Sequence, residues 1–593
     1  MTTATGTTAT SAPAAGGPAE PDQAETASAA RFARRILRAD ARAWLISLAM
    51  WVPFFSGSIP SGLALRAAID ALPAHQGGAL WGYLALVAAI ELGRWGLLLP
   101  AIVQWHGAFA FWQTVPRINA LRSLTRDPGP VTDRLPGSPG EAVSRFRDDT
   151  RDIAEVLDVW LDVVASALTT AAGLTILAVI SVPVAIAVAL PIVAVVWFGR
   201  LLADRLRAWR LAERQATAEV TSFIGDAFGA VTAVKVAAAE PGIARHFAQL
   251  GLHRAAAARR DQVGTQLAQV LGGITANAGL GLALLLAAPS MHSGDLSAGD
   301  IGLLATYAGA LGHFPRITAR LWAWQSQAEV SAARLGRLMV DREPDSASRP
   351  VRTWLRHGPP PFAAEPLRPP ADRTGQDRLQ HLCVRSLRVH LDDDDQLRGV
   401  DLDVGRGDLV VLTGPVGSGK TVLVRALLGL VPRSAGVLTW NGSDVDEPST
   451  WFVPPRVAYV PQVARLFSEP LADTILLGQP GTTLHHALRL ACLDEDLADL
   501  PDGLATMVGP KGVRLSGGQA QRAATARALV RRPELLVIDD LSSALDVITE
   551  ARLWDGLFET AGGDLTVLAV SHRPRVLDRA DHVVELRGGR VAG

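Results

Sequence analysis

The octapeptide GPVGSGKT, residues 414–421, constrains the fold of this chain more than any other feature. It fits the pattern G-x-x-x-x-G-K-[ST], follows the apolar run Leu409 to Thr413, and opens a helical pattern at Thr421. Glycines allow backbone N–H groups to converge on phosphate oxygens, and the start of a helix adds a favourable dipole. The motif therefore predicts a strand, a phosphate-binding loop and a helix; a Gly-rich structural turn is the alternative without a ligand.

The chemistry of a nucleoside triphosphate assigns roles within this loop. Lys420 is expected to reach the β- and γ-phosphates, and the hydroxyl of Thr421 is expected to bind Mg²⁺. ATP and Mg²⁺ are therefore the expected cofactors. The residues expected to contact the nucleotide are Gly414, Pro415, Val416, Gly417, Ser418, Gly419, Lys420, Thr421 and Val422.

A second motif is the run LLVIDD, residues 535–540. Its apolar part predicts a buried strand. Asp539 is expected to hold Mg²⁺, and Asp540 is expected to face the attacking water. A strand followed by an acidic N-cap is the alternative without chemistry. Further apolar runs, LVVLT and LTVLAV, alternate with helical patterns, which predicts an α/β domain with a mostly parallel sheet.

The N-terminal half of the chain has a different character. Hydrophobic residues make up 49% of the chain and its mean hydropathy is +0.21, a value that indicates segments in lipid. A bilayer core requires about 20 apolar residues per helix, and six such spans are predicted, which form an all-α transmembrane domain. They cover residues 43–65, 80–104, 159–180, 182–203, 267–288 and 298–322.

Charged residues in the connections between these spans indicate the topology. The connections 117–151 and 200–260 are rich in Arg, whereas 73–80, 181–183 and 289–299 contain no Lys or Arg. The positive-inside rule therefore places both termini in the cytoplasm of a multi-pass membrane protein. Arg66, near the outer end of the first span, does not fit this pattern.

Composition also sets the expected domain limits. Residues 1–29 contain almost no large apolar group and predict a disordered tail. The transmembrane domain is expected at 30–340, a Pro-rich linker at 341–380 and the nucleotide-binding domain at 381–593.

The net charge and the residue usage indicate the setting. The net charge of −1 gives no support for a nucleic-acid partner. Abundant Ala and scarce Lys indicate a GC-rich bacterial genome, and therefore a bacterial cytoplasmic membrane. Two cysteines, Cys383 and Cys492, cannot form a disulfide framework and fit a reducing cytosol.

The pentapeptide LSGGQ, residues 515–519, lies between the two motifs that carry the expected ATP chemistry. Here the chain resembles the ATP-binding cassette (ABC) family, for which this pentapeptide is the signature. The resemblance implies that this helix start binds the γ-phosphate of a nucleotide held mainly by a partner subunit. The signature residues expected to contact that nucleotide are Ser516, Gly517, Gly518 and Gln519.

Other segments extend the resemblance within the C-terminal domain. Gln462 in YVPQ is similar to the family's Q-loop residue and is a further expected Mg²⁺ ligand, and His572 in AVSH is similar to its switch histidine. SALD, residues 543–546, is similar to the D-loop. The resemblance thus implies that the catalytic residues are Asp540, His572 and Gln462.

The membrane half agrees with the same family. GEAVSRFRDDTRDI (140–153) and FIGDAFGAVTAVKVAAAE (223–240) resemble its cytoplasmic connections, and TMVGPKG (506–512) resembles the X-loop of exporter-type members. The resemblance covers about residues 31–593. It implies a type IV exporter fold, in which a six-helix transmembrane domain is joined to an α/β P-loop cassette. It also implies a dimer that holds two nucleotides between its cassettes.

Three positions depart from the family pattern. Asp540 stands where the family usually has Glu, which withdraws the carboxylate from the attacking water by one methylene; a misplacement of about 1 Å can cost on the order of 10²-fold in rate. A working conservative replacement is the alternative. Leu391, or His390, stands where an aromatic residue normally stacks on adenine, and Pro510 replaces the X-loop acid.

An intact signature beside an altered catalytic carboxylate implies a second half-transporter as partner, and favours a heterodimer over a homodimer. The expected activity is ATP-driven export of an amphipathic small molecule, lipid or peptide. A regulatory subunit that hydrolyses ATP poorly and an importer on the exporter fold are the alternatives.

The sequence does not identify the transported compound. Ionisable residues within spans are candidates for substrate contact, although Glu91 and Arg94 could instead neutralise each other. The candidates are Glu91, Arg94, His106, Asp158, Asp162 and His313.

Overall fold

A computed structural model describes residues 29–73, 77–125, 129–130, 139–293, 295–340, 343–351, 353, 378–391, 394–509, 512–513, 515–541, 545–561 and 565–592. The chain divides into two compact units, residues 1–121 with 138–358 and residues 122–137 with 359–593. The predicted tail, except Ala29, and residues 354–377 of the predicted linker lie outside the described part.

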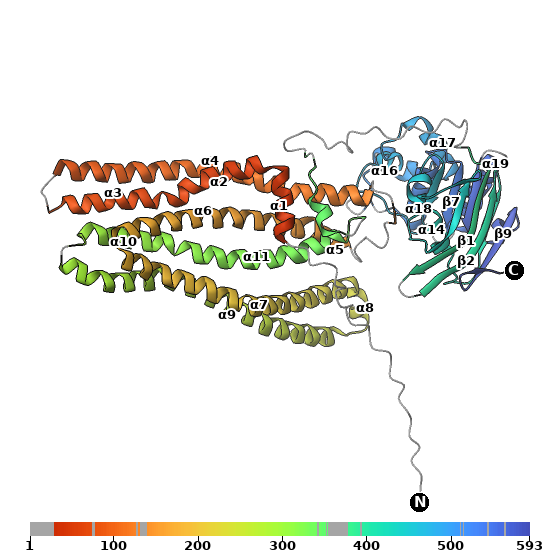
Figure 1. The fold of residues 1–593 in the computed structure, drawn as a ribbon. Helices are drawn as coiled ribbons and strands as arrows, with labels where there is room; N and C mark the ends of the chain where they lie inside the picture. The colour runs from red at the N-terminus through yellow and green to blue at the C-terminus, as the bar shows by residue number, and fades with distance from the viewer. Residues whose placement is uncertain are drawn as a thin grey trace, which may run out of the picture. The chain divides into compact units, whose positions relative to one another are not determined.

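The described part of the first unit is helical (Figure 1). Its helices are α1 (Ala29–Ala39), α2 (Ala41–Ser56), α3 (Ser58–Ala71), α4 (Gly77–Thr125), α5 (Pro139–Ser144), α6 (Thr150–Ile180), α7 (Val182–Gly229), α8 (Val231–Val236), α9 (Glu240–His292), α10 (Ala298–Leu311) and α11 (His313–Gly336). A π-helical turn at Arg145–Asp149 precedes α6, and a 3-10 turn at Pro344–Ser348 follows α11.

Four helical segments of the described residues are long and apolar enough to cross a membrane. They are Ala41–Ala71, Gly78–Thr125, Ala142–Ile180 and Val182–Leu202. These segments contain the first three predicted spans and all but the last residue of the fourth. The fifth predicted span lies within α9 and the sixth continues from α10 into α11, so both positions are helical but remain predictions as membrane spans.

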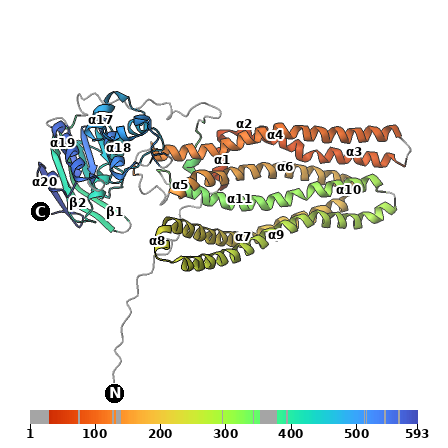
Figure 2. The same ribbon diagram turned by 180° about the vertical axis from the view of Figure 1, so that it is seen from behind.

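Three helices are much longer than the roughly 20 residues that a bilayer core requires. α4 has 49 residues, α7 has 48 and α9 has 53. α7 and α9 run side by side in both views (Figures 1 and 2). Gly264 of α9 allows this approach, because a Cβ there would lie 2.6 Å from Leu206 and 2.8 Å from Trp209 of α7.

The turn between α6 and α7 lies where the sequence places it. Ser181 has extended backbone angles, φ −158° and ψ 112°, and a proline follows within the first turn of α7. Proline suits this position because the first turn of a helix does not use its N–H. α10 begins in a similarly defined way, at a capping box formed by Ser297 and Asp300.

Arg66 has acidic partners that the sequence analysis did not identify. Its Nε lies 2.8 Å from Oδ1 of Asp300 on α10 and 4.0 Å from Oδ2 of Asp70. The second carboxylate also accepts a hydrogen bond from the backbone N–H of Gly299 over 2.9 Å. Arg66 is therefore paired between α3 and α10 rather than isolated near the membrane.

The second unit contains a six-stranded sheet with the order β10-β9-β3-β8-β7-β6. Its strands are β3 (Leu409–Thr413), β6 (Val457–Val460), β7 (Leu535–Asp539), β8 (Thr566–Val570), β9 (His582–Arg587) and β10 (Arg590–Val591). All neighbours are parallel except β10, which pairs antiparallel with β9. The predicted mostly parallel sheet is confirmed.

Both faces of this sheet are covered. All five residues of β7 are buried. Leu536 and Ile538 belong to one apolar core cluster, and Leu535 and Val537 belong to the other. Because side chains alternate along a strand, the continuous apolar run in the sequence supplies both clusters at once.

A second, antiparallel sheet has the order β2-β1-β4-β5 and was not predicted. Its strands are β1 (His381–Leu391), β2 (Asp394–Gly405), β4 (Ala435–Trp440) and β5 (Ser443–Asp444). On β1, Leu382 and Val384 are buried whereas His381 and Arg385 are exposed. Such polar and apolar alternation marks a sheet with one solvated face.

Helices complete the second unit. They are α14 (Lys420–Leu427), α15 (Pro448–Trp451), α16 (Leu471–Leu476), α17 (Leu484–Leu490), α18 (Gly517–Leu529), α19 (Val547–Ala561) and α20 (Pro574–Leu577). α14 and α18 matter most for the site, because each begins at one of the predicted phosphate-binding motifs.

Candidate nucleotide-binding site

The predicted catalytic and metal-binding residues follow neighbouring strands at one edge of the parallel sheet. Gln462 comes after β6, Asp539 ends β7, and His572 comes after β8. Parallel strands bring their carboxyl ends to the same edge, where ligands bind in open α/β folds. The topology therefore collects residues that are far apart in the sequence.

The phosphate loop joins β3 to α14 and depends on glycine. Gly414 has φ 134°, and a Cβ there would lie 2.1 Å from the backbone oxygen of Leu586. Gly417 and Gly419 also have positive φ, 80° and 99°, which other residues rarely adopt. Gly419 precedes α14 without a side-chain cap, an arrangement that suits a phosphate at the helix start.

Lys420 is held within this loop by backbone oxygens. Its Nζ donates to the carbonyls of Gly414 over 2.7 Å and Pro415 over 2.8 Å. Partial burial lowers the pKa of Lys420, and the nearby carboxylates of Asp540 and Asp539 oppose that shift. An ammonium group folded into its own loop is ready to exchange these carbonyls for phosphate oxygens.

Thr421 and Asp539 provide adjacent oxygen atoms for a divalent ion. The Thr421 hydroxyl donates to Oδ1 of Asp539 over 2.9 Å, and the hydroxyl of Tyr459 donates to Oδ2 over 3.2 Å. Burial raises the pKa of Asp539, and these two hydrogen bonds oppose the shift. Hard oxygen donors fit Mg²⁺, and Thr421 and Asp539 would hold it beside the phosphates.

Asp540 and Gln462 are brought together beyond the end of β7. The Gln462 side-chain amide donates to Oδ2 of Asp540 over 3.3 Å. Asp540 has φ 53°, in the left-handed region that Asp tolerates better than most residues. Such backbone conformations are frequent at functional sites. The expected role of Gln462 as a Mg²⁺ ligand remains a prediction.

His572 lies next to the strand end from which the phosphate loop begins. Its Nδ1 is 3.3 Å from Oγ1 of Thr413, the last residue of β3. The side chain is exposed, so the ring is accessible at the same sheet edge. Thr413 was not among the predicted site residues, although its place at the end of β3 could have suggested it.

The remaining predicted loop residues have mixed surroundings. Val416 is fully exposed, whereas Ser418 is only 4% exposed and its hydroxyl lies 3.4 Å from Nζ of Lys420. Val422 is partly buried against the core. Ser418 and Val422 thus anchor the loop, whereas the side chain of Val416 projects into solvent.

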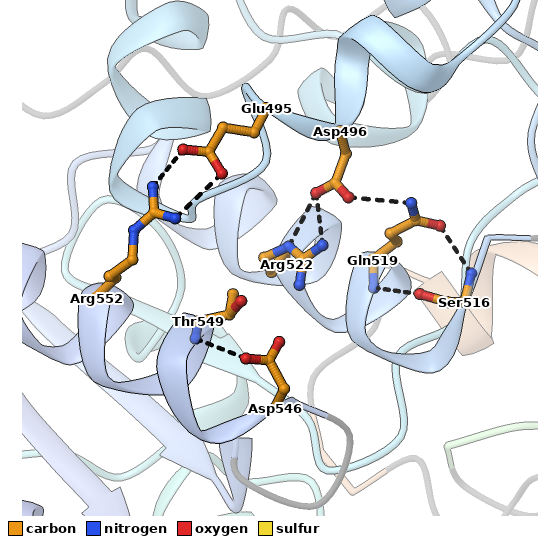
Figure 3. Close-up of polar contacts among 8 residues, drawn as sticks. All are labelled: Glu495, Asp496, Ser516, Gln519, Arg522, Asp546, Thr549 and Arg552. Atoms are coloured by element: carbon orange, nitrogen blue, oxygen red, sulfur yellow. Dashed lines mark hydrogen bonds and ion pairs between the residues drawn. The ribbon is translucent and has the colours of Figure 1, made fainter.

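The signature forms the start of α18 through a reciprocal capping box (Figure 3). The Ser516 hydroxyl accepts from the backbone N–H of Gln519 over 3.2 Å, and the Gln519 side chain accepts from the backbone N–H of Ser516 over 2.9 Å. Gly517 and Gly518 form the first turn between them. The cap fixes this helix start, which is the feature that suits phosphate binding.

Asp496 supports the signature and was missed by the sequence analysis. It accepts from Nε2 of Gln519 over 3.0 Å and from Arg522 over 2.6 Å, and Figure 3 shows it between these two side chains. The Asp496 and Arg522 side chains are only 16% and 11% exposed. Glu495 points instead toward Arg552 of α19. A hydrophilic segment, DEDLAD, gave no sign of which acid would face the signature.

Asp546 of the predicted D-loop caps α19. Its Oδ1 accepts from the backbone N–H groups of Ile548 over 3.1 Å and Thr549 over 3.0 Å. The bond from Thr549 is the main cause of the lowered pKa of Asp546. Ser543 and Ala544 of the same motif, and Pro510 of the predicted X-loop, lie outside the described residues.

The residues expected near adenine lie at the end of β1. Leu391 is partly buried against the core of the cassette. His390 is exposed, and its Nδ1 lies 3.0 Å from Oδ1 of Asp395. A contact of either residue with adenine remains a prediction.

Glu91 and Arg94 are paired on α4. Arg94 lies 3.1 Å from Oε2 of Glu91, and the hydroxyl of Ser61 on α3 donates to Oε1 over 2.8 Å. This is the mutual neutralisation that the sequence left open. His106 and His313 make local contacts, to the carbonyl of Ile102 and to Arg316.

Asp158 and Asp162 lie one turn apart on α6 and share a cation from α11. Arg320 lies 3.8 Å from Asp158 and 3.7 Å from Asp162, and also 3.5 Å from Glu155. Trp105 of α4 donates to Oδ1 of Asp158 over 2.6 Å. Asp158 and Asp162 are thus mostly buried between helices, and their expected contact with substrate remains a prediction.

Two family models match the chain. The model of the ABC transporter matches residues 397–543, and that of the ABC transporter transmembrane region matches residues 117–312. The first contains the phosphate loop, the signature and Asp539, and the second contains most of the helical unit.

Curated relatives match this chain over different shares of its length. A probable multidrug resistance ABC transporter ATP-binding/permease protein of Bacillus subtilis is 37% identical over 201 residues, which are 33% of this chain and 34% of that protein. The ATP-dependent lipid A-core flippase of Chromobacterium violaceum is 29% identical over 476 residues, 76% of this chain and 74% of that protein. For the flippase of Burkholderia pseudomallei the matched share is 65% of the relative.

A solved structure shares the fold. A bacterial Atm1-family ABC exporter with ATP bound matches 94% of both chains with a TM-score of 0.74 and 21% sequence identity. The chain therefore belongs to the ABC transporters and carries their transmembrane region and their ATPase domain in one polypeptide.

Proposed function

We propose that this chain is one half of a dimeric exporter in the bacterial cytoplasmic membrane, driven by ATP and with both termini in the cytoplasm. Its cargo is an amphipathic small molecule, lipid or peptide. The observation that carries the proposal is the arrangement of Lys420, Thr421 and Asp539 in the same polypeptide as four long apolar helices. That arrangement suits Mg²⁺-ATP, and the helices supply a route through lipid.

The printed names of the relatives support an exported, amphipathic cargo. They include a lipid A-core flippase, a multidrug resistance protein and a cyclolysin secretion protein of Bordetella pertussis, the last 36% identical over 210 residues. A lipid, drugs and a secreted protein share no detailed chemistry, so the proposal stops at the class of cargo.

A second half-transporter is the proposed partner, because the signature of α18 would complete the nucleotide site of another cassette. The capping box fixes Ser516 and Gly517 at the start of this helix, where they would contact the nucleotide of the other cassette. The shortened carboxylate of Asp540 favours a different chain as that partner, one that carries Glu at this position. Two identical chains would both have the short carboxylate.

Asp540 also supports a second candidate, a regulatory subunit that binds ATP and hydrolyses it poorly. The side-chain amide of Gln462 donates to Asp540 over 3.3 Å. It contacts the carboxylate oxygen with which a catalytic base would hold the attacking water. Such a subunit would keep ATP bound at its own site while a partner's site turns over.

Transport into inverted membrane vesicles tests the proposal. Vesicles containing the chain with its candidate partner should accumulate a fluorescent amphipathic dye, or a fluorescently labelled lipid, only when Mg²⁺-ATP is present. A Lys420→Ala variant should lose this accumulation. Glu495→Gln, a change at an exposed residue that pairs with Arg552, controls for expression. Movement of the probes in the opposite direction would indicate an importer. ATP-independent movement would contradict the proposal.

A further inference from the structure

Three side chains with different metal-binding chemistry meet on the solvent face of the antiparallel sheet. They are His381 and Cys383 of β1 and Asp403 of β2, and their ligand atoms all lie within 4.8 Å of one another. Sγ of Cys383 donates to Oδ1 of Asp403 over 3.1 Å, and Nε2 of His381 is 3.6 Å from the same oxygen. This cluster belongs to neither the phosphate loop nor the signature.

The strand register brings the three residues together. His381 and Cys383 are two residues apart and therefore point to the same face of β1. Cys383 lies directly opposite Asp403 in the antiparallel pair, and His381 lies opposite Gly405. Asp403 is therefore the diagonal neighbour of His381 on this face, within reach of the imidazole. Leu382 and Val384 anchor the other face of the strand in the core.

We propose that His381, Cys383 and Asp403 bind one Zn²⁺ ion or a similar thiophilic divalent cation. Imidazole nitrogen, thiolate sulfur and carboxylate oxygen are the three ligand types that zinc uses in proteins. A thiolate disfavours Mg²⁺ and Ca²⁺, which prefer oxygen. On binding, the Cys383 thiol releases its proton to solvent, and thiolate with carboxylate then balances the charge of the ion. Water takes the fourth position.

The distances require little movement. Metal–ligand distances of about 2.0–2.3 Å place the ligand atoms of a tetrahedral site roughly 3.3–3.8 Å apart. The observed 3.1 Å and 3.6 Å separations from Asp403 are near this range. All three side chains are on the surface or only half-buried, so they can adjust without disturbing the core.

Arg385 is the competitor for Asp403. Its guanidinium donates to Oδ2 over 2.9 Å and to Oδ1 over 2.8 Å. The ion would take Oδ1, and Arg385 would keep Oδ2 and so position the carboxylate. Ligating carboxylates are commonly held by such an outer hydrogen bond. Arg385 is thus a positioning residue and not a ligand.

Cobalt absorption tests the site on the full-length chain, purified without a polyhistidine tag, treated with chelator and free of nucleotide. Co²⁺ should produce a thiolate-to-metal charge-transfer band that saturates at one ion per chain and disappears on addition of Zn²⁺. Cys383→Ser should abolish the band, and His381→Gln and Asp403→Asn should weaken binding by roughly 10-fold or more. The matched control is Cys492→Ser, which removes the other free cysteine and should leave the band intact.

Thermal unfolding provides a second measurement, because a ligand that binds only the folded state raises the melting temperature. Zn²⁺ should raise it in the parent chain and in Cys492→Ser but not in Cys383→Ser. Absence of a charge-transfer band in the parent chain would overturn the proposal. Co²⁺ binding of equal strength in Cys383→Ser would also overturn it, and would assign the ion to oxygen ligands elsewhere.

Discussion

The side-chain amide of Gln462 donates to the carboxylate of Asp540 over 3.3 Å, beyond the end of β7. The contact links the residue after β6 to the residue that would face the attacking water. Asp540 holds this position with a left-handed backbone, φ 53°. The shorter side chain of Asp540 therefore changes how far the carboxylate reaches, while the residue keeps its place beyond β7.

Adding the missing methylene should raise hydrolysis at this chain's own site. Gly517→Val would first silence the partner's site, because the signature of this chain would serve that site in the proposed dimer. In that background, Asp540→Glu should increase the residual ATP turnover by about 10- to 100-fold. The measurement is ATP hydrolysis by the purified complex. Asp540→Asn is the control that keeps the shorter length, and it should give no increase.

Lys420→Ala should remove most nucleotide binding at this chain's own site. Lys420 is the cation of the phosphate loop and lies 2.7 Å from the carbonyl of Gly414. Photo-crosslinking with an azido-ATP analogue should label the variant much less than the parent chain. Lys235→Ala, on α8, is the matched loss of one lysine, and its labelling should be unchanged. Equal labelling of both variants would mean that the loop is not the principal anchor.

Asp539 should produce a pH dependence of stability in the nucleotide-free protein. Burial raises the pKa of Asp539, so its ionised form is disfavoured in the folded state. This contribution is fully favourable below the unfolded pKa and is lost as the pH rises through the folded value. Asp539→Asn keeps the size but cannot ionise, and its amide oxygen can accept only one of the two hydroxyl hydrogen bonds that the carboxylate accepts, a loss that does not depend on pH. The variant should therefore gain melting temperature relative to the parent as the pH rises from 4 toward 8.

The same substitution should abolish Mg²⁺-dependent nucleotide binding, because the amide no longer supplies a negative oxygen. Thermal melts across this pH range, with and without Mg²⁺-ATP, measure both effects. A difference between variant and parent that grows as the pH falls would contradict the assigned direction.

Much of this site follows from the sequence, for identifiable physical reasons. The glycines of the phosphate loop and the apolar run of β7 are patterns within a few residues, so the sequence reveals them directly. The resemblance to one family identifies Gln462 and His572 as site residues. The box of Ser516 and Gln519 fits a local pattern that could have been recognised from the sequence alone.

Contacts between distant segments could not be predicted in this way. Asp300 pairs with Arg66, and Asp496 pairs with Arg522, through helices whose facing sides no local pattern reveals. The antiparallel sheet was missed for a related reason. Its strands alternate between buried and exposed residues and carry no continuous apolar run.

Asp496→Asn should weaken the signature without affecting the phosphate loop. The change removes the charge that pairs with the mostly buried Arg522 and should cost on the order of 2 kcal/mol. ATP turnover of the assembled complex should fall, while photo-labelling at this chain's own loop stays unchanged.

The control for this prediction is Arg552→Gln, which breaks the exposed pair with Glu495 and should cost much less stability than Asp496→Asn, because solvent screens exposed pairs. Melting temperature and ATP turnover of the two variants should therefore differ clearly. Equal effects would mean that Asp496 does not position the signature.

The proposed topology predicts which positions are accessible from outside the cell. In a chain with Cys383 and Cys492 replaced by Ser, a cysteine at Ser293 should react with a membrane-impermeant reagent in intact cells. A cysteine at Val236, which is 85% exposed on α8, should react only after permeabilisation. The reverse pattern would place the termini outside.

The most direct test of the central claim is steady-state ATP hydrolysis by the purified complex, with its assembly verified by size. The account of an ATP-driven half-transporter with a slow site of its own predicts that Asp540→Ala leaves most of the turnover intact. Gly517→Val should remove nearly all of it, because in the proposed dimer that glycine would serve the partner's competent site. Equal loss in the two variants, or a fully active homodimer of this chain alone, would contradict the account and make Asp540 an ordinary catalytic base.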